Sequence, residues 1–136
     1  MKPPAILIVH HDPVALDLYA GTYSTCLSPV PKLLTANNNA DALRICSEQT
    51  VDLLITNISR SGATSGPEDG DGLILLEKIK KQFPSLPVFM ATGSVSGEQY
   101  QRALELGADR WFALPEGMAD LLAAVASRFG LQNTRS

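Results

Sequence analysis

The sequence predicts a single α/β domain built on one parallel β-sheet with helices on both of its faces. Five short apolar runs have the length and β-branched content of buried strands, and they alternate with five segments of helical periodicity. Such strict alternation favours parallel strands joined by right-handed crossovers. The 136-residue length suits one domain, and 45% hydrophobic residues suffice for its core. We expect this domain to cover residues 1–131, with a frayed polar tail over 132–136.

The first strand and helix, and the second strand and helix, follow directly from local signals. Residues 5–9 are an unbroken apolar run, which predicts a strand buried on both faces. Pro13 suits the first turn of a helix, whose apolar stripe runs over residues 16–27. A second strand is expected over 32–36, and the three asparagines at 37–39 supply an N-cap for the short helix that follows.

The middle of the chain predicts a third strand, a long loop and a third helix. Residues 52–56 form another apolar run, and residues 59–70 are rich in glycine and hydroxyl residues, which indicates a loop. An apolar stripe over 73–83 predicts the next helix, with Lys78, Lys80 and Lys81 on its solvent side.

The last third of the chain predicts two more strand and helix units. A buried strand is expected over 87–91, and the sequence at 96–99 forms a capping box for a helix that ends before Gly107. The fifth strand is expected over 110–114. The last helix carries its apolar stripe over 118–129, and Gly130 ends it.

Composition excludes several classes of function. The net charge is −3 and only 18% of residues are charged, so no nucleic-acid partner and no membrane surface are expected. The apolar runs are too short to span a bilayer. Cys26 and Cys46 are expected to be free thiols in a reducing compartment, which favours a cytoplasmic protein.

The chain resembles the receiver domains of response regulators, the CheY-like family. The resemblance is carried by the runs at 6–9 and 52–56, by Asp71-Gly72-Leu73, by 87–92, and by 107–111 before Pro115. These motifs cover nearly the whole chain in the family's order. The resemblance implies a flavodoxin-like, doubly wound sheet of five parallel strands in the order 2-1-3-4-5 with five helices. It also implies a role in two-component or phosphorelay signal transduction.

The residues that would carry the family's chemistry differ from the family pattern. In receiver domains two acidic residues after the first strand hold magnesium, whereas this chain has His10 and His11. The phosphoacceptor aspartate that ends the third strand is replaced by Asn57, and the lysine before the last proline is replaced by Leu114. The hydroxyl residue of the family is retained as Thr92.

These replacements predict a pseudo-receiver, which is not an enzyme and is not phosphorylated at the usual site. An amide such as Asn57 is not a nucleophile for phosphoryl transfer at neutral pH. Imidazole and amide groups are poor ligands for Mg²⁺, so no resident cofactor is expected and magnesium binding should be absent or weak. The resemblance thus implies a protein-interaction module that acts independently of phosphorylation.

Trp111 stands at the position of the family's aromatic switch residue. The face formed by the fourth helix, fifth strand and fifth helix is therefore the expected docking surface for a histidine kinase or a downstream effector. A surface aromatic that simply covers the core is an equal alternative, and a homodimer is also open. The resemblance further implies a cis bond between Leu114 and Pro115.

Three alternatives remain from the residues alone. His10, His11 and Asp12 could hold a transition metal, although two histidines in a vacated acidic pocket are the simpler interpretation. The vacated crevice could bind a small ligand under a lid formed by the 59–70 loop. Asp12 or Glu68 could accept a phosphoryl group unconventionally. Asp52 lies at the opposite end of its strand and is expected only to be solvated.

Overall fold

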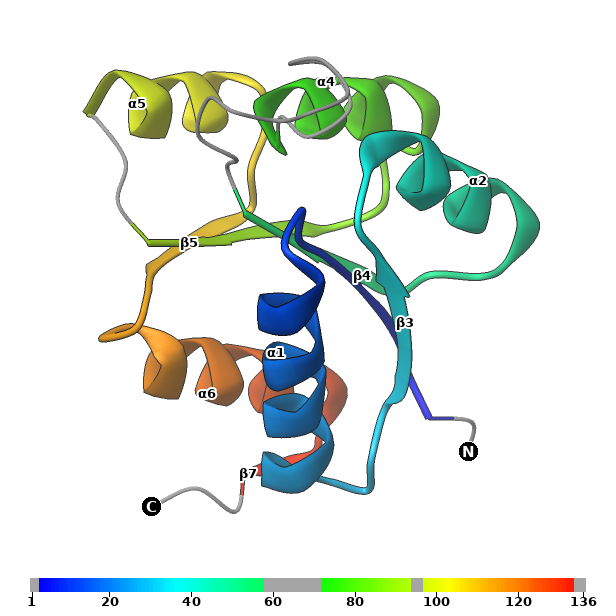
Figure 1. Ribbon diagram of the computed structural model, residues 1–136, viewed down its shortest axis with the longest axis vertical. Helices are drawn as coiled ribbons and strands as arrows, with labels where there is room; N and C mark the ends of the chain where they lie inside the picture. The colour runs from blue at the N-terminus through cyan, green and yellow to red at the C-terminus, as the bar shows by residue number, and fades with distance from the viewer. Residues whose placement is uncertain (1–2, 58–71, 94–96, 134–136) are drawn as a thin grey trace.

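A five-stranded parallel sheet forms the centre of the molecule in the computed structural model, which describes residues 3–57, 72–93 and 97–133 (Figure 1). Its strands, from one edge to the other, are β3 (Lys32–Ala36), β1 (Ala5–Val9), β4 (Leu53–Thr56), β5 (Val88–Thr92) and β6 (Arg110–Ala113). Numbered along the chain, this order is 2-1-3-4-5. The predicted flavodoxin-like topology is confirmed, and all neighbouring pairs are parallel.

Helices cover both faces of the sheet (Figure 1). α1 (Pro13–Cys26) and α6 (Met118–Phe129) lie on one face, while α2 (Asn39–Glu48), α4 (Gly72–Gln82) and α5 (Gly97–Glu105) lie on the other. Because successive strand residues point to opposite faces, the core is divided into two clusters. Ile6 and Ile8 of β1 enter the cluster under α1 and α6, and Leu7 and Val9 enter the one under the other three helices.

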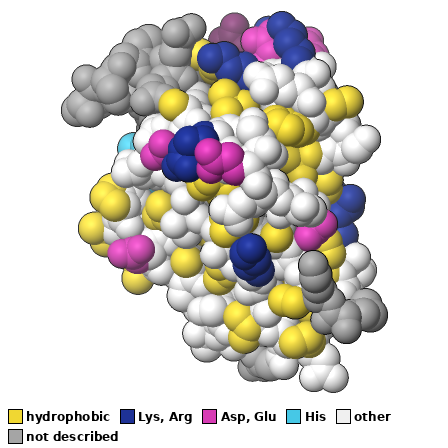
Figure 2. Space-filling model, turned by 90° about the vertical axis from the view of Figure 1, so that its right-hand side faces the viewer, with side chains coloured by type: hydrophobic (Ala, Val, Ile, Leu, Met, Phe, Trp, Pro, Cys, Tyr) yellow, Lys and Arg dark blue, Asp and Glu magenta, His cyan; other side chains and the backbone are white. Residues whose placement is uncertain are grey.

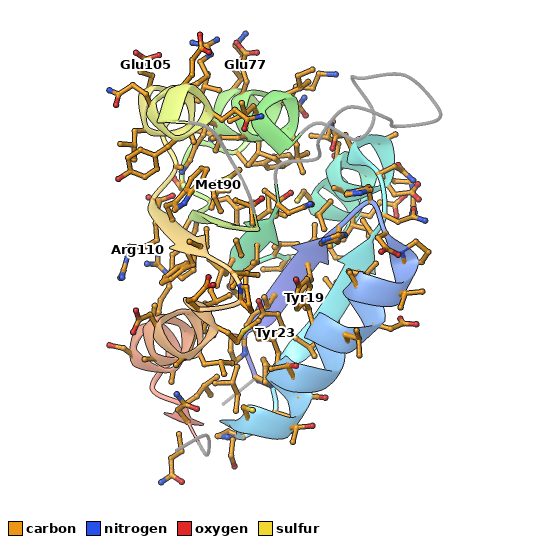
Figure 3. The ribbon with its side chains drawn as sticks, turned by 60° about the vertical axis from the view of Figure 1, so that its left-hand side comes forward. Tyr19, Tyr23, Glu77, Met90, Glu105 and Arg110 are labelled. Carbon is orange, nitrogen blue, oxygen red and sulfur yellow. The ribbon has the colours of Figure 1, made fainter. Side chains whose placement is uncertain are left out.

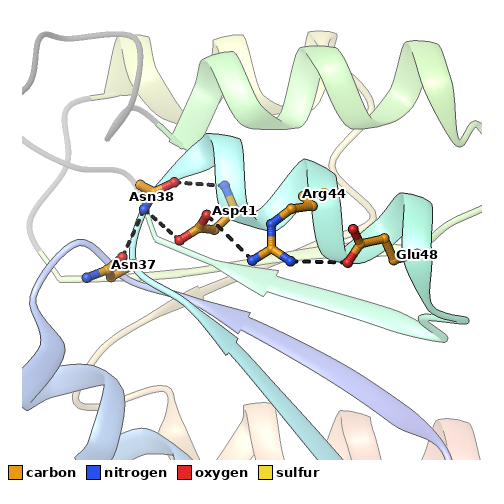
Figure 4. A network of polar contacts seen from close by, with 5 residues as sticks. All are labelled: Asn37, Asn38, Asp41, Arg44 and Glu48. Atoms are coloured by element: carbon orange, nitrogen blue, oxygen red, sulfur yellow. Dashed lines mark hydrogen bonds and ion pairs between the residues drawn. The ribbon is translucent and has the colours of Figure 1, made fainter.

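Local signals in the sequence set the helix ends. Asn38 caps α2 by accepting a hydrogen bond from the Asp41 N–H at 2.8 Å, and its side chain also contacts Asn37 and the Asp41 carboxylate (Figure 4). Gly107 and Gly130 have φ values of 100° and 66°, as expected after helices that end in a glycine. The capping box predicted at 96–99 begins at Ser96, which lies outside the described residues.

The predicted strands agree with the structure to within one residue at each end, because hydrogen bonding at an element's end is gradual. Residues 5–9 and 32–36 are reproduced without change, and the other three strands are Leu53–Thr56, Val88–Thr92 and Arg110–Ala113. The Leu114–Pro115 bond is cis, as predicted, and the Ser28–Pro29 bond is also cis. Cys26 and Cys46 do not form a disulfide bond with each other.

A second, two-stranded sheet corrects the prediction of a frayed tail. β2 (Leu27–Ser28) pairs antiparallel with β7 (Gln132–Asn133), so Gln132 and Asn133 are ordered against the end of α1. The prediction is wrong for these two residues because it judged their polar side chains and not their backbone groups. The rest of the tail, residues 134–136, lies outside the described chain.

Two charged side chains that were expected only to meet solvent have structural roles. The Asp52 carboxylate accepts a hydrogen bond from the Ala5 N–H at 2.8 Å and so joins β4 to the start of β1. Lys80, expected on the solvent side of its helix, is half-buried and donates to the Leu86 carbonyl at 2.9 Å and to the Asp109 carboxylate at 2.8 Å. The same Asp109 oxygen accepts from the Val88 N–H.

Candidate functional site

The carboxyl ends of the strands bring the predicted site residues to one edge of the sheet. Val9 pairs with Thr56 in register, so His10 and Asn57 follow β1 and β4 at the same level. Thr92 pairs with Ala113, which places Leu114 directly beyond it. In doubly wound folds this edge is where ligands bind.

His10 and His11 stack on each other at the end of β1. Their ring centroids are 4.9 Å apart with an interplanar angle of 18°, and the His10 ring also contacts Tyr19 of α1 at 5.6 Å. Tyr19 lies between α1 and the sheet in Figure 3. Burial lowers the pKa of His10 below its ordinary value, the neighbouring His11 lowers it further, and Asp12 opposes the shift. The environment therefore favours a neutral His10.

Asp12 serves the backbone of α1. Its Oδ1 accepts a hydrogen bond from the Val14 N–H at 3.0 Å, and it is the N-cap residue of the helix. Its own N–H donates to Nδ1 of His10 at 3.0 Å. Within the described parts of the chain, no group of three histidine, cysteine or acidic side chains is arranged to hold a metal ion. The geometry of His10, His11 and Asp12 thus gives no support to the metal alternative.

Asn57 and Thr92 lie at the ends of β4 and β5, on the same edge of the sheet as His10. Asn57 is half-buried, and its backbone carbonyl accepts a hydrogen bond from the Thr56 hydroxyl at 3.3 Å. Thr92 is only 3% exposed, and its carbonyl accepts from the Leu114 N–H at 2.8 Å. The groups at these two strand ends are therefore an amide and a buried hydroxyl, neither of which carries charge.

Leu114 belongs to the hydrophobic core and not to the pocket. It is 7% exposed and packs in the cluster between the sheet, α1 and α6, with Met118 among its members. A residue so placed fills the interior with hydrocarbon and presents no charge to the strand ends.

Trp111 has an aromatic neighbour that the sequence interpretation missed. Tyr100 of α5 meets the Trp111 ring edge-on, with centroids 5.1 Å apart and an interplanar angle of 87°. Tyr100 and Leu104 are the exposed large hydrophobic residues of α5, at 42% and 43%. Their spacing of four residues on the outer side of a predicted helix was the signal available in the sequence.

Two hollows in the structure lie at the opposite edge of the sheet. One measures about 940 Å³ and the other about 660 Å³, and Asp52 and Phe129 line both. Neither includes His10, Asn57 or Leu114. The lid predicted over 59–70, together with Glu68, lies outside the described residues, so the small-ligand alternative stays a prediction.

Charge is distributed evenly over the surface that can be seen. On the face in Figure 2, basic and acidic side chains lie next to one another among hydrophobic ones, without a continuous basic area. Glu77 of α4 and Glu105 of α5 point away from the sheet in Figure 3, and both belong to ion pairs with basic neighbours. No helix in the described ranges is long and apolar enough to cross a membrane.

Comparison with known proteins agrees with this architecture. The chain is 29% identical over 97 residues to the sensor histidine kinase RcsC of Salmonella typhi, and 35% identical over 80 residues to an NtrX-like response regulator of Rickettsia felis. These alignments cover 69% and 59% of the chain but only 10% and 16% of the two relatives. The chain therefore spans a small part of the length of these curated proteins.

A solved structure extends the likeness to the whole domain. The receiver domain of NtrX from Brucella abortus superposes with a TM-score of 0.73 at 33% identity, over 90% of this chain and 95% of that one. The family model described as the response regulator receiver domain matches residues 6–126. The parallel sheet, its strand order and these matches lead to one conclusion: the chain belongs to the response regulator receiver domain family, the CheY-like modules of two-component signalling.

Proposed function

We propose that this receiver domain acts in the cytoplasm as a phosphorylation-independent interaction module and is not an enzyme. The observation that carries the proposal is the set of groups at the strand ends. Imidazoles, an amide and a buried leucine stand where receiver chemistry uses two acidic residues, an aspartate and a lysine. Asp12, the carboxylate nearest to them in sequence, is engaged in capping α1.

The chemistry of these groups supports the proposal independently of any comparison. Phosphoryl transfer needs a nucleophile and a divalent cation to neutralise the developing charge. Asn57 supplies no anionic oxygen, and the imidazole nitrogens of His10 and His11 are not the hard oxygen ligands that Mg²⁺ requires. Any regulation through this site would then come from a bound protein and not from a phosphoryl group.

The first test is phosphorylation in vitro. The protein is incubated with acetyl phosphate and Mg²⁺ and examined by intact-mass measurement, beside a receiver domain that has a phosphoacceptor aspartate. We expect no phosphoryl adduct on the wild type or on Asn57→Asp, because the magnesium ligands and the lysine are also absent. An adduct on the wild type would refute the proposal. An adduct on Asn57→Asp alone would show that the missing ligands are not what prevents the reaction.

The partner surface in this proposal is the α5–β6–α6 face, meaning the outer surface of those three elements. A histidine kinase or a downstream effector is the expected occupant, and a second copy of the chain is the alternative. Tyr100, Leu104 and Trp111 support this assignment because they place exposed or half-buried hydrophobic side chains together on the face. Aromatic residues are enriched among those that dominate binding energy.

The second test measures which face binds. Copurification identifies the partner, and its affinity is then measured by calorimetry for Trp111→Ala and for Leu18→Ala. Leu18 lies on α1, on the opposite side of the sheet from Trp111 and α5, and is 67% exposed. We expect the Trp111 variant to lose at least about thirtyfold in affinity, the size of a binding hot spot, and the Leu18 variant to bind as the wild type does. Loss of binding in Leu18→Ala alone would place the docking surface on α1.

A further inference from the structure

Tyr100 of α5 contacts the half-buried Trp111 of β6. The inner side of the indole packs against the core cluster beneath α2, α4 and α5, and the Tyr100 ring meets it edge-on at 5.1 Å and 87°. Edge-to-face pairs of this kind are preferred over stacked ones because the positive ring edge meets the negative ring face. Trp111 is thus held between the core on one side and Tyr100 on the other.

The register of the sheet shows how Trp111 relates to the strand-end pocket. Trp111 pairs with Met90, and Thr92 lies two residues further along β5. Because side chains alternate along a strand, Thr92 and Met90 point to the same face of the sheet as Trp111. A displacement of the indole toward Thr92 would therefore take place on this face, and it would change the contact between Trp111 and Tyr100.

We infer that Tyr100 is a positioning residue that holds Trp111 in one orientation, so that this aromatic pair, and not the strand-end pocket, sets the shape of the α5–β6–α6 face. The inference rests on the proposed function, which makes this face the docking surface. It adds the residue that fixes the surface and the reason that the surface stays constant. An aromatic pair of this geometry changes the preference between two orientations by about fivefold.

The experiment uses Trp111 as its own probe, since it is the single tryptophan of the chain. Emission spectra and acrylamide quenching are recorded for the wild type, Tyr100→Ala and Tyr100→Phe. Leu104→Ala is the matched control, because Leu104 lies on the same helix with the same exposure. Thr92→Val tests the pocket by removing the hydroxyl while keeping the shape. Far-UV circular dichroism confirms that each variant is folded.

We expect a red-shifted emission and about twofold stronger quenching in Tyr100→Ala, whereas Tyr100→Phe keeps the ring and behaves as the wild type does. Leu104→Ala and Thr92→Val should also match the wild type. An unchanged Tyr100→Ala would overturn the inference, as would an equal effect of Leu104→Ala or Thr92→Val. Partner affinity is measured separately. If Tyr100→Ala frees Trp111 but binding is unaffected, the positioning role stands and the docking proposal fails.

Discussion

Truncation of Leu114 tests whether this position belongs to the hydrophobic core or to an open pocket. Leu114→Ala removes three carbon atoms from a side chain that is 7% exposed. At about 0.8 kcal/mol for each buried methylene, the lost transfer free energy is about 2.4 kcal/mol. The cavity left between the sheet, α1 and α6 adds to this, so we expect the free energy of unfolding to fall by about 3 kcal/mol.

Leu104→Ala provides the same chemical change at a site that is 43% exposed on α5. We expect it to cost less than about 1 kcal/mol, because nearly half of the residue is already exposed to water and its removal leaves no closed cavity. Both variants and the wild type are unfolded in urea and followed by far-UV circular dichroism, and the free energies are obtained by linear extrapolation. Equal costs for the two variants would show that Leu114 does not anchor the core and that the pocket is open beneath it.

Three further predictions concern the polar groups of His10, Cys46 and Asp109. Because the pKa of His10 is lowered in the folded protein, the unfolded chain binds more protons as the pH drops through the ordinary value of 6.5, and the free energy of unfolding should fall. The loss between pH 7.5 and about pH 5 should be smaller in His10→Asn than in the wild type. An unchanged loss would contradict the burial of His10. Burial raises the pKa of the Cys46 thiol to about 11, so iodoacetamide at about pH 8 should modify Cys46 only after the protein unfolds. The modified residue is located by peptide mass analysis. Rapid modification of Cys46 in the native protein would contradict its burial. Asp109→Ala removes the carboxylate that accepts from the buried Val88 N–H and from Lys80, and we expect a loss of about 2 kcal/mol in urea unfolding. Glu48→Ala, which breaks the exposed pair with Arg44 drawn in Figure 4, should cost only about 0.5 kcal/mol, and a similar cost for both would show that the Asp109 bonds are no stronger than a surface ion pair.

The sequence could predict the fold because its local signals agree with one another. The apolar run at residues 5–9 is entirely buried in the structure, as a central strand with two covered faces must be. Asn38 and Gly130 mark helix ends through short-range hydrogen bonding and backbone conformation, which depend on only a few neighbouring residues. The strand order came from the family resemblance, since no local signal specifies which strands become neighbours.

The features that the sequence could not predict depend on contacts between distant segments. Lys80 has the pattern of a solvent-facing lysine, and only the fold brings Asp109, 29 residues later, within reach of it. The pairing of Leu27–Ser28 with Gln132–Asn133 involves two strands of two residues each, too short to show any periodicity. The contact between Tyr100 and Trp111 likewise requires the packing of α5 on β6. Of these contacts, the one between Tyr100 and Trp111 joins two elements of the α5–β6–α6 face.

The sheet separates the side chain of Trp111, in β6, from that of Leu114, which follows the strand. Trp111 faces the core cluster under α2, α4 and α5, whereas Leu114 packs in the cluster under α1 and α6. A layer of hydrogen-bonded backbone lies between these two clusters. The division of the interior means that the two residues support the α5–β6–α6 face through different helices: Leu114 packs with residues of α6, and Trp111 contacts Tyr100 of α5.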